Sequence, residues 1–178
     1  MKVAITGHSR GIGQAIAQAL SQEHTIVGMS RSNGFDVSNV DSIVSAAADC
    51  DVFVNNAYAG LAQIEILKQL YSLWQDKTRL IINIGSTVTD YPRSNSQVNE
   101  NEPWPYRDHK KLLASTFRQL AWNQASPCRL ALVTPGATDT DMIHHLTLFK
   151  IPPQEIANAV LLVINNPSIK EITVYRTN

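Results

Sequence analysis

The chain has 178 residues, of which 44% are hydrophobic and 17% charged, so length and composition indicate one globular domain with a buried core. Fifteen basic and fifteen acidic residues cancel, which argues against nucleic acid or an anionic membrane surface as a partner. No apolar run is long enough to cross a membrane, and the residues after Met1 read as a strand instead of a signal peptide, so we expect a cytoplasmic protein.

Short β-rich apolar runs alternate with helix-like segments along the chain. Strands are expected at 3–6, 25–29, 51–57, 79–85, 129–135 and 171–177, and helices at 11–23, 39–49, 61–75, 106–125 and 153–166. Ser38 is expected to cap the second helix, and Pro152 and Pro153 to open the last one. The alternation predicts an α/β fold, a doubly wound Rossmann-type parallel sheet with right-handed crossovers and helices on both faces.

One connection is too short for this scheme. Only residues 30–33 separate the second strand from the segment GFDV at 34–37. A parallel neighbour needs a crossover of roughly a dozen residues or more. GFDV should therefore form at most a brief bridge at the sheet edge. We expect about six main parallel strands, with one edge unit of the common doubly wound pattern missing.

The segment TGHSRGIG at 6–13 joins the first strand to the first helix, which is the context of a dinucleotide-binding loop. Gly7 allows a sharp turn, Gly11 lets a pyrophosphate approach the backbone, and Gly13 lets helix and strand pack closely. The helix N-terminus would then offer free N–H groups to phosphates. The alternative is a glycine-rich βα turn that binds no ligand.

Further motifs follow this loop in a characteristic order. They are NNA at 55–57, NIGS ending at Ser86, Tyr106 with Lys110 four positions later, and PG at 135–136. Together with the glycine loop, this order resembles the short-chain dehydrogenase/reductase family, from the first strand to the last. The resemblance implies that residues 1–178 form a single NAD(P)-binding Rossmann-fold domain.

Ser86, Tyr106 and Lys110 are the candidate catalytic residues. Of the five tyrosines, only Tyr106 has a lysine four positions later, and residues at that spacing share a helix face. A nearby ammonium favours the phenolate and lowers the tyrosine pKa, so Tyr106 could exchange a proton with a substrate oxygen. By resemblance, Lys110 also holds the nicotinamide ribose. Ser86 either orients the substrate carbonyl or serves as a simple turn cap.

The resemblance also assigns cofactor contacts along the chain. They comprise Gly7, Ser9, Arg10, Gly11, Ile12 and Gly13 for the phosphates, Asp36, Asn55 and Ala57 for the adenosine, and Tyr106, Lys110, Pro135, Gly136, Thr138 and Thr140 for the nicotinamide half or the phosphates. Asn55 could instead tie neighbouring strands together. NAD-preferring folds carry a carboxylate after the second strand, where this chain has Arg31 between two serines. The guanidinium groups of Arg10 and Arg31 suit a 2′-phosphate, which favours NADP over NAD. The alternative is that the two arginine side chains are merely solvated.

Two features depart from the family pattern, and the cysteines and paired histidines indicate no metal site. The spacing from Ser86 to Tyr106 is long, and the extra polar segment at 90–105 either lines the substrate mouth or is a solvated excursion. Family members usually carry an asparagine that takes part in a proton relay. The corresponding position in this chain falls near Ala59, the helix at 61–75 contains no asparagine, and Gln63 is the amide nearest to that position. Cys50, Cys128 and the adjacent histidines at 144–145 lack metal-ligand spacing, so we expect no metal and reduced thiols, with a disulfide as the alternative.

These observations together predict an NADP-dependent oxidoreductase that interconverts a carbonyl and an alcohol on a small molecule. The alternative is a dinucleotide-binding sensor that has lost turnover, and an epimerase or dehydratase of related fold is a further rival. The segment at 143–151 is short, which implies a small or open substrate pocket. The apolar helix at 106–125, with the helix at 61–75, predicts self-association as a homodimer or homotetramer.

Overall fold

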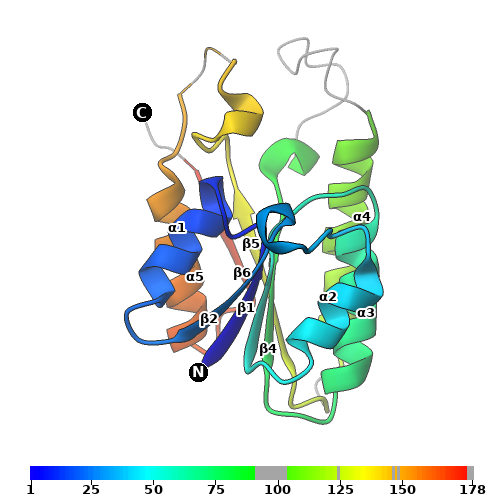
Figure 1. The fold of residues 1–178 in the computed structure, drawn as a ribbon. Helices are drawn as coiled ribbons and strands as arrows, with labels where there is room; N and C mark the ends of the chain where they lie inside the picture. Colours follow the sequence, from blue (N-terminus) through cyan, green and yellow to red (C-terminus); the bar gives the residue numbers. More distant parts are fainter. Residues whose placement is uncertain (91–103, 124, 146, 148, 176–178) are drawn as a thin grey trace.

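Six parallel strands form a twisted sheet that carries helices on both faces (Figure 1). The computed structural model describes residues 1–90, 104–123, 125–145, 147 and 149–175. The strands are β1 (Lys2–Thr6), β2 (Thr25–Met29), β3 (Val52–Asn55), β4 (Leu80–Ile84), β5 (Arg129–Pro135) and β6 (Glu171–Val174). The helices are α1 (Gly11–Leu20), α2 (Val40–Ala47), α3 (Ala62–Trp74), α4 (Trp104–Ala121) and α5 (Pro153–Asn165). The predicted α/β class and its main elements are confirmed.

The strand order is β2-β1-β3-β4-β5-β6, with every neighbouring pair parallel. The chain moves outward from β1 to β2, returns to pair β3 with the other edge of β1, and then adds each later strand on that side. The direction therefore reverses at β1, and a sheet of this kind binds ligands beyond the strand ends at such a point.

The short connection after β2 forms a single 3-10 turn, η1 (Arg31–Asn33). Residues 34–37 belong to no strand or bridge. This agrees with the expectation that the connection at 30–33 is too short for a crossover to a parallel neighbour. Six main strands with a missing edge unit is therefore the observed arrangement.

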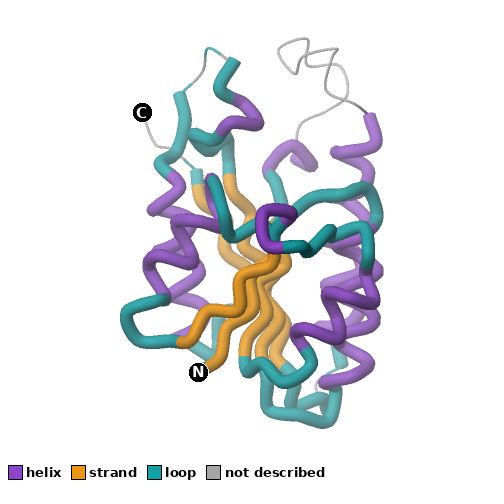
Figure 2. Tube along the Cα trace, in the orientation of Figure 1, coloured by secondary structure: helices purple, strands orange, loops and turns teal. Residues whose placement is uncertain are grey.

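Two apolar layers hold the helices on the sheet. Helices α1 and α5 cover one face, where Ile16 and Val160 are fully buried, and α2, α3 and α4 cover the other, where Leu67 and Phe117 are buried (Figures 1 and 2). Strands β3 and β4 are buried at every position because both of their faces are covered. Their carboxyl ends consequently stand at fixed positions beneath the loops.

The N-cap of α2 differs from the prediction. Asn39, and not Ser38, caps the helix, because the Asn39 side chain accepts a hydrogen bond from the Ser42 N–H at 3.2 Å. Ser38 instead donates from its backbone N–H and its hydroxyl to Asp36 Oδ1, at 2.9 and 2.7 Å. The aspartate therefore takes the serine that would otherwise cap the helix, and the helix begins one residue later. Pro153 opens α5 as predicted.

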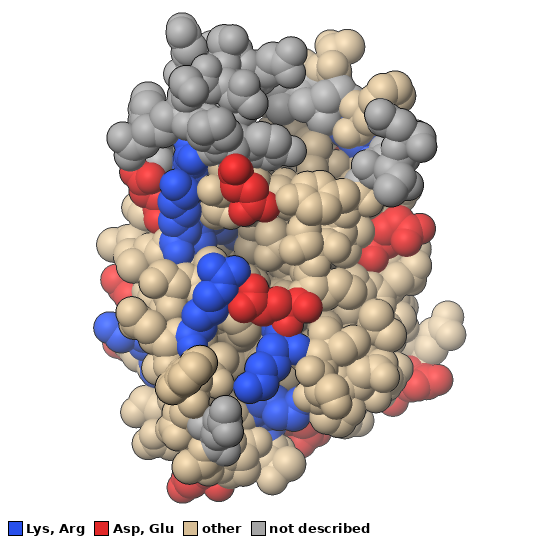
Figure 3. Space-filling view, turned by 180° about the vertical axis from the view of Figure 1, so that it is seen from behind, with Lys and Arg blue, Asp and Glu red and all other residues tan. Residues whose placement is uncertain are grey.

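The surface carries charges of both signs. On the face opposite that of Figure 1, lysine and arginine side chains lie beside aspartate and glutamate side chains (Figure 3). An exposed ion pair joins Arg118 and Glu171 at 2.8 Å. No helix in the described part of the chain is both long enough and apolar enough to span a membrane.

Candidate active site

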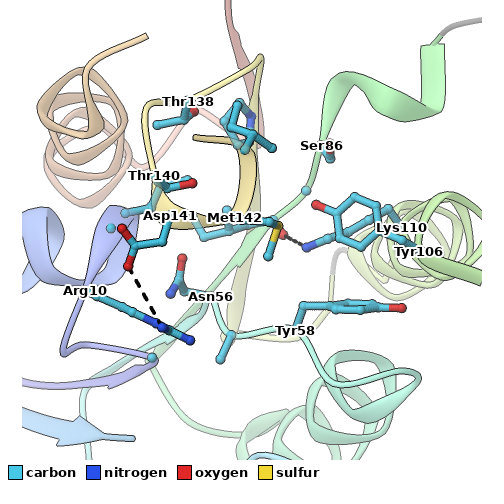
Figure 4. A pocket seen from close by; sticks show the side chains of 18 of the residues that line it. Arg10, Asn56, Tyr58, Ser86, Tyr106, Lys110, Thr138, Thr140, Asp141 and Met142 are labelled. Carbon is cyan, nitrogen blue, oxygen red and sulfur yellow. Dashed lines mark hydrogen bonds and ion pairs between the residues drawn. The ribbon is translucent and has the colours of Figure 1, made fainter. Parts of the chain in front are cut away.

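A cleft of about 1120 Å³ runs along the carboxyl ends of the strands, between the loops that follow β1, β2, β3, β4 and β5 (Figure 4). Thr6 and Asn56 join two of these ends where the chain reverses direction. The Thr6 hydroxyl oxygen accepts from the N–H groups of Asn56 and Ala57 at 2.9 and 3.0 Å, and the Asn56 amide donates to the Thr6 carbonyl at 2.9 Å. These bonds fix the floor of the cleft beside the glycine loop.

The glycine loop requires its glycines for steric reasons. Gly7 and Gly11 have φ angles of 69° and 55°, which residues with a side chain rarely adopt. A Cβ atom on Gly13 would lie 2.2 Å from the Gly7 carbonyl oxygen, so α1 could not pack this closely with any other residue. Arg10 precedes α1 without a side-chain cap bond, which leaves the first N–H groups of the helix for an anion. The loop therefore fits the pyrophosphate of a dinucleotide.

At the other side of this loop, Arg31 and Asp36 line the cleft beyond β2. Hydrogen bonds from Ser38 to the Asp36 carboxylate lower its pKa below the ordinary value, so Asp36 stays ionised at neutral pH. Ser30 and Ser32 are hydrogen-bonded to each other at 2.7 Å, which orders the short turn η1. An arginine and an ionised aspartate thus line this end of the cleft.

Most residues that the sequence assigns to the site line this one cleft. They are Gly7, Ser9, Arg10, Gly11, Ile12, Arg31, Asp36, Ala57, Ser86, Tyr106, Lys110, Pro135, Gly136, Thr138 and Thr140. Gly13 lies behind the loop, and Asn55 is fully buried beneath the cleft. The Asn55 amide donates to the Asn83 side-chain oxygen at 3.0 Å and to the Gln63 carbonyl at 2.8 Å. Asn55 therefore ties β3 to β4 and α3, which is the second of its two predicted roles.

Lys110 is buried in spite of its charge, with a relative exposure of 3%. Its ammonium donates to Gln63 Oε1 at 2.8 Å and to the Ile84 carbonyl at 2.7 Å. Burial lowers the pKa of Lys110 from 10.5 to about 7. Nζ lies 5.6 Å from the centre of the Tyr106 ring, on the adjacent turn of α4. The predicted tyrosine–lysine pair is thus brought together in the cleft wall.

Tyr106 and Ser86 occupy the same end of the cleft as Lys110. The Tyr106 side chain extends into the cleft, and Ser86 lies on the β4 side of it (Figure 4). Ser86 Oγ accepts a hydrogen bond from the Val88 N–H at 3.3 Å, so the serine does serve the turn at η2 (Thr87–Asp90). Because a hydroxyl accepts and donates at once, its proton can still be directed to a ligand.

Tyr58 and His109, which the sequence reasoning did not assign to the site, support Tyr106. The Tyr58 ring meets the Tyr106 ring edge-on, with centroids 4.7 Å apart, and its hydroxyl is 3.0 Å from His109 Nδ1. This packing fixes the plane of the Tyr106 ring. The available signal was the position of Tyr58, directly after the NNA motif.

From the sequence, Gln63 was noted only as the amide nearest to the place of the missing relay asparagine, yet its side chain contacts Lys110 directly. The described helix α3 contains no asparagine, as the sequence states. A signal for Gln63 was present: it is an amide among apolar residues in the first turn of a helix that packs on the sheet.

The loop after β5 closes the remaining side of the cleft. Asp141, in the turn η3 (Asp141–Ile143), lies 3.9 Å from Arg10 of the glycine loop, and both side chains are exposed (Figure 4). Met142 and Phe149 add apolar surface at this mouth. The predicted loop at 90–105 falls, apart from its ends, outside the described residues.

The two cysteines and His8 do not line the cleft. Cys50 and Cys128 are buried and free, and burial raises the pKa of Cys128 to about 11. The His8 ring packs against Gly28, where a Cβ atom would lie 2.3 Å from it, and does not line the cleft. In the described residues, no group of three or more histidines, cysteines or acidic residues could hold a metal ion.

No protein-family model matches the sequence, and no curated protein matches it. Solved structures do match. A short chain dehydrogenase from Burkholderia cenocepacia J2315, in complex with NADP, is 18% identical with a TM-score of 0.81, covering 98% of this chain and 88% of that one. A 3-alpha-hydroxysteroid dehydrogenase from Pseudomonas sp. B-0831, complexed with NADH, is 18% identical with a TM-score of 0.80, covering 98% and 95%.

A third structure, 3-ketoacyl-(acyl-carrier-protein) reductase from Brucella melitensis complexed with NADH, is 17% identical with a TM-score of 0.77, covering 97% of this chain and 96% of that one. Over nearly its whole length, this chain therefore has the fold of the short-chain dehydrogenases and reductases. The order of motifs in the sequence predicted this fold.

The buried ammonium makes a prediction about stability. Between pH values of about 7 and 10.5 the unfolded chain binds a proton at Lys110 that the folded chain has released. Lys110 therefore makes the free energy of unfolding rise with pH across this window, by up to about 1.4 kcal/mol per pH unit. Below pH about 7, Lys110 is protonated in both the folded and the unfolded chain, so the folded state bears the full cost of burying the charge.

Urea titrations of the wild type and Lys110→Met at several pH values in this window measure the effect. The difference between wild type and variant should grow in favour of the wild type as pH rises. Lys111→Met, at the exposed neighbouring lysine, is the matched control. A difference between wild type and Lys110→Met that stays constant with pH would contradict the expectation.

Proposed function

We propose that the protein is an oxidoreductase that transfers a hydride between NADP(H) and a small carbonyl or alcohol substrate. The observation that carries the proposal is one cleft with a glycine cradle at one end and Ser86, Tyr106 and Lys110 together at the other. The similar structures with bound NADP or NADH support a dinucleotide as the ligand of this cleft.

Each residue has a role that its position supports. When bound, the reduced nicotinamide supplies the hydride, and the N–H groups after Arg10 hold the pyrophosphate. The Ser86 hydroxyl donates a hydrogen bond to the substrate carbonyl oxygen, and the Tyr106 phenol gives that oxygen its proton. The positive charge of Lys110, close to the Tyr106 ring, stabilises the phenolate that remains.

A second function, binding of the cofactor without turnover, remains the alternative. The absence of an asparagine from α3 and the missing edge unit favour it. Binding of NADPH combined with no turnover over a wide panel of carbonyl compounds would select this alternative.

Tyr106→Phe should abolish carbonyl reduction and leave NADPH affinity almost unchanged. The phenol acts as the general acid, and loss of such a group costs about a hundredfold to ten-thousandfold in rate. The ring and its packing on Tyr58 are preserved in the variant. The measurement is loss of NADPH absorbance with a panel of aldehydes, ketones and quinones. A variant that keeps most of the wild-type rate would exclude Tyr106 as the acid.

NADPH should bind more tightly than NADH, and Arg31→Ala should remove most of the difference. A hydrogen bond from a charged group contributes about 1.5–3 kcal/mol, so the loss should be roughly tenfold to a hundredfold for NADPH alone. Fluorescence titration of both cofactors gives the affinities. Lys68→Ala, at an exposed lysine of α3, is the control. Equal affinities in the wild type would remove the charge argument.

We further propose that the chain self-associates as a homodimer or homotetramer through α3 and α4. Leu113 and Phe117 of α4 are buried on the sheet, but Leu112 and Trp122 are 47% and 83% exposed. Light scattering at micromolar concentration should show an oligomer that Trp122→Ala weakens. Leu162→Ala, an exposed leucine of α5, should leave it intact. A wild type that stays monomeric would contradict this proposal.

A further inference from the structure

Gln63 is a buried polar side chain in an apolar surrounding. It lies in the first turn of α3 with a relative exposure of 2%, next to the buried residues Ala62 and Ile64. A buried amide costs free energy unless both of its ends are hydrogen-bonded. Both ends of Gln63 are: Nε2 donates to the Asn55 carbonyl at 2.7 Å, and Oε1 accepts from Lys110 at 2.8 Å.

The partners of Gln63 fix the orientation of its amide. An ammonium has no acceptor, so the amide end that meets Lys110 must be the oxygen, and the end that meets the Asn55 carbonyl must be the NH₂ group. The Asn55 side chain in turn donates to the Gln63 backbone carbonyl at 2.8 Å. The two residues therefore bind each other reciprocally and pin the first turn of α3 to the end of β3.

The ammonium of Lys110 has three N–H donors. Two of them go to Gln63 Oε1 and to the Ile84 carbonyl, which both belong to the protein interior. Lys110 also lines the cleft, so the third donor remains for a ligand there. Gln63 thus anchors the ammonium from behind and leaves its reactive side towards the cleft.

We propose that Gln63 is a positioning residue that holds the Lys110 ammonium beside Tyr106 through a direct, uncharged hydrogen bond. This inference rests on the proposed function, because it assigns Lys110 its task in that function. A neutral partner is essential to the role. A carboxylate at this place would keep the ammonium charged but would offset its field, so the net positive charge that acts on the Tyr106 phenol would be smaller.

The other groups around Lys110 do not replace this contact. On α4 itself, Tyr106 and His109 are neighbours, and His109 is engaged with the Tyr58 hydroxyl. A second hollow that also reaches Lys110 is lined by Asp90, Lys111, Arg118 and Glu171. Arg118 and Glu171 pair with each other at 2.8 Å. The low pKa of Lys110 follows from burial, which agrees with an environment of neutral acceptors.

The contact can be tested in the full chain without cofactor, by a double-mutant cycle of Gln63→Leu and Lys110→Met. Gln63→Leu should destabilise the wild type, because it removes an acceptor from a buried ammonium. In the Lys110→Met background, the same substitution should lower the free energy of unfolding by much less. Equal costs in both backgrounds would overturn the direct contact.

Gln63→Glu gives a second readout in the same protein. Its carboxylate should raise the pKa of Lys110 by about one unit or more, since an opposite charge at hydrogen-bond distance favours the ammonium. The lower edge of the pH window in which Lys110 affects unfolding should move upward accordingly, while the upper edge, set by the unfolded chain, stays near 10.5. A lower edge that stays near pH 7 would overturn the proposal that Gln63 controls the charge of Lys110.

The catalytic readout compares kcat and its pH profile in Gln63→Leu and Gln63→Glu with those of Gln69→Leu, a change at an exposed glutamine of α3. Gln63→Leu should lower kcat by about a hundredfold, as misplaced catalytic groups do, with a smaller effect on NADPH affinity. Gln63→Glu should shift the pH profile, and Gln69→Leu should do neither.

Unchanged kcat and pH profile in both Gln63 variants would overturn the positioning role. If the wild type binds NADPH but reduces no substrate, the proposed function fails. The cofactor-free measurements then decide about Gln63 alone: coupling to Lys110 supports the inference, and its absence overturns it.

Discussion

The burial of one ammonium governs how this end of the molecule is built. A charge removed from water needs hydrogen-bond acceptors at fixed distances, and Lys110 finds them in Gln63 and in the carbonyl of Ile84. These acceptors belong to α3 and β4, and the lysine belongs to α4. Three elements must therefore keep their relative positions, and the register that sets Asn55 opposite Asn83 in β3 and β4 becomes part of the same constraint.

The two ends of the cleft are built by different physical means. At the glycine loop, the absence of side chains allows close approach, and Gly13 meets the Gly7 carbonyl at a distance that only glycine permits. At the Lys110 end, buried polar side chains hold the elements together through a connected set of hydrogen bonds. The paired ends of β1 and β3, tied by Thr6 and Asn56, join the two halves into one cleft.

The fold could be predicted because its signals are local. Apolar runs, proline positions and a connection too short for a crossover are all visible in neighbouring residues. The error at the α2 cap arose because Ser38 had a competing acceptor, Asp36, only two positions away. Most predicted site residues that line the cleft come from loops at strand ends, where position in the chain almost fixes position in space, whereas Tyr106 and Lys110 come from α4.

What the sequence could not give depends on contacts between distant segments. Whether the Gln63 side chain points to solvent or to Lys110 depends on the phase of α3 and on where α4 lies, 47 positions further along the chain. Tyr58 and His109 meet across 51 positions. For Asn55, both roles were open from sequence, and the packing of β3 between its neighbours buried it beneath the cleft.

The missing edge unit also bears on how the chain folds. In a doubly wound sheet, the pairing across the reversal point joins strands that are not successive in sequence, here Val3 with Val52. A chain without the extra strand and helix brings these partners together over a shorter loop. Loop-closure entropy grows slowly with length, by about 0.6 kcal/mol per doubling, so stability gains little. Folding rate depends more strongly on sequence separation, and each remaining strand adds beside its immediate predecessor. The sheet can therefore grow in the order in which the chain is synthesised once β3 has joined β1.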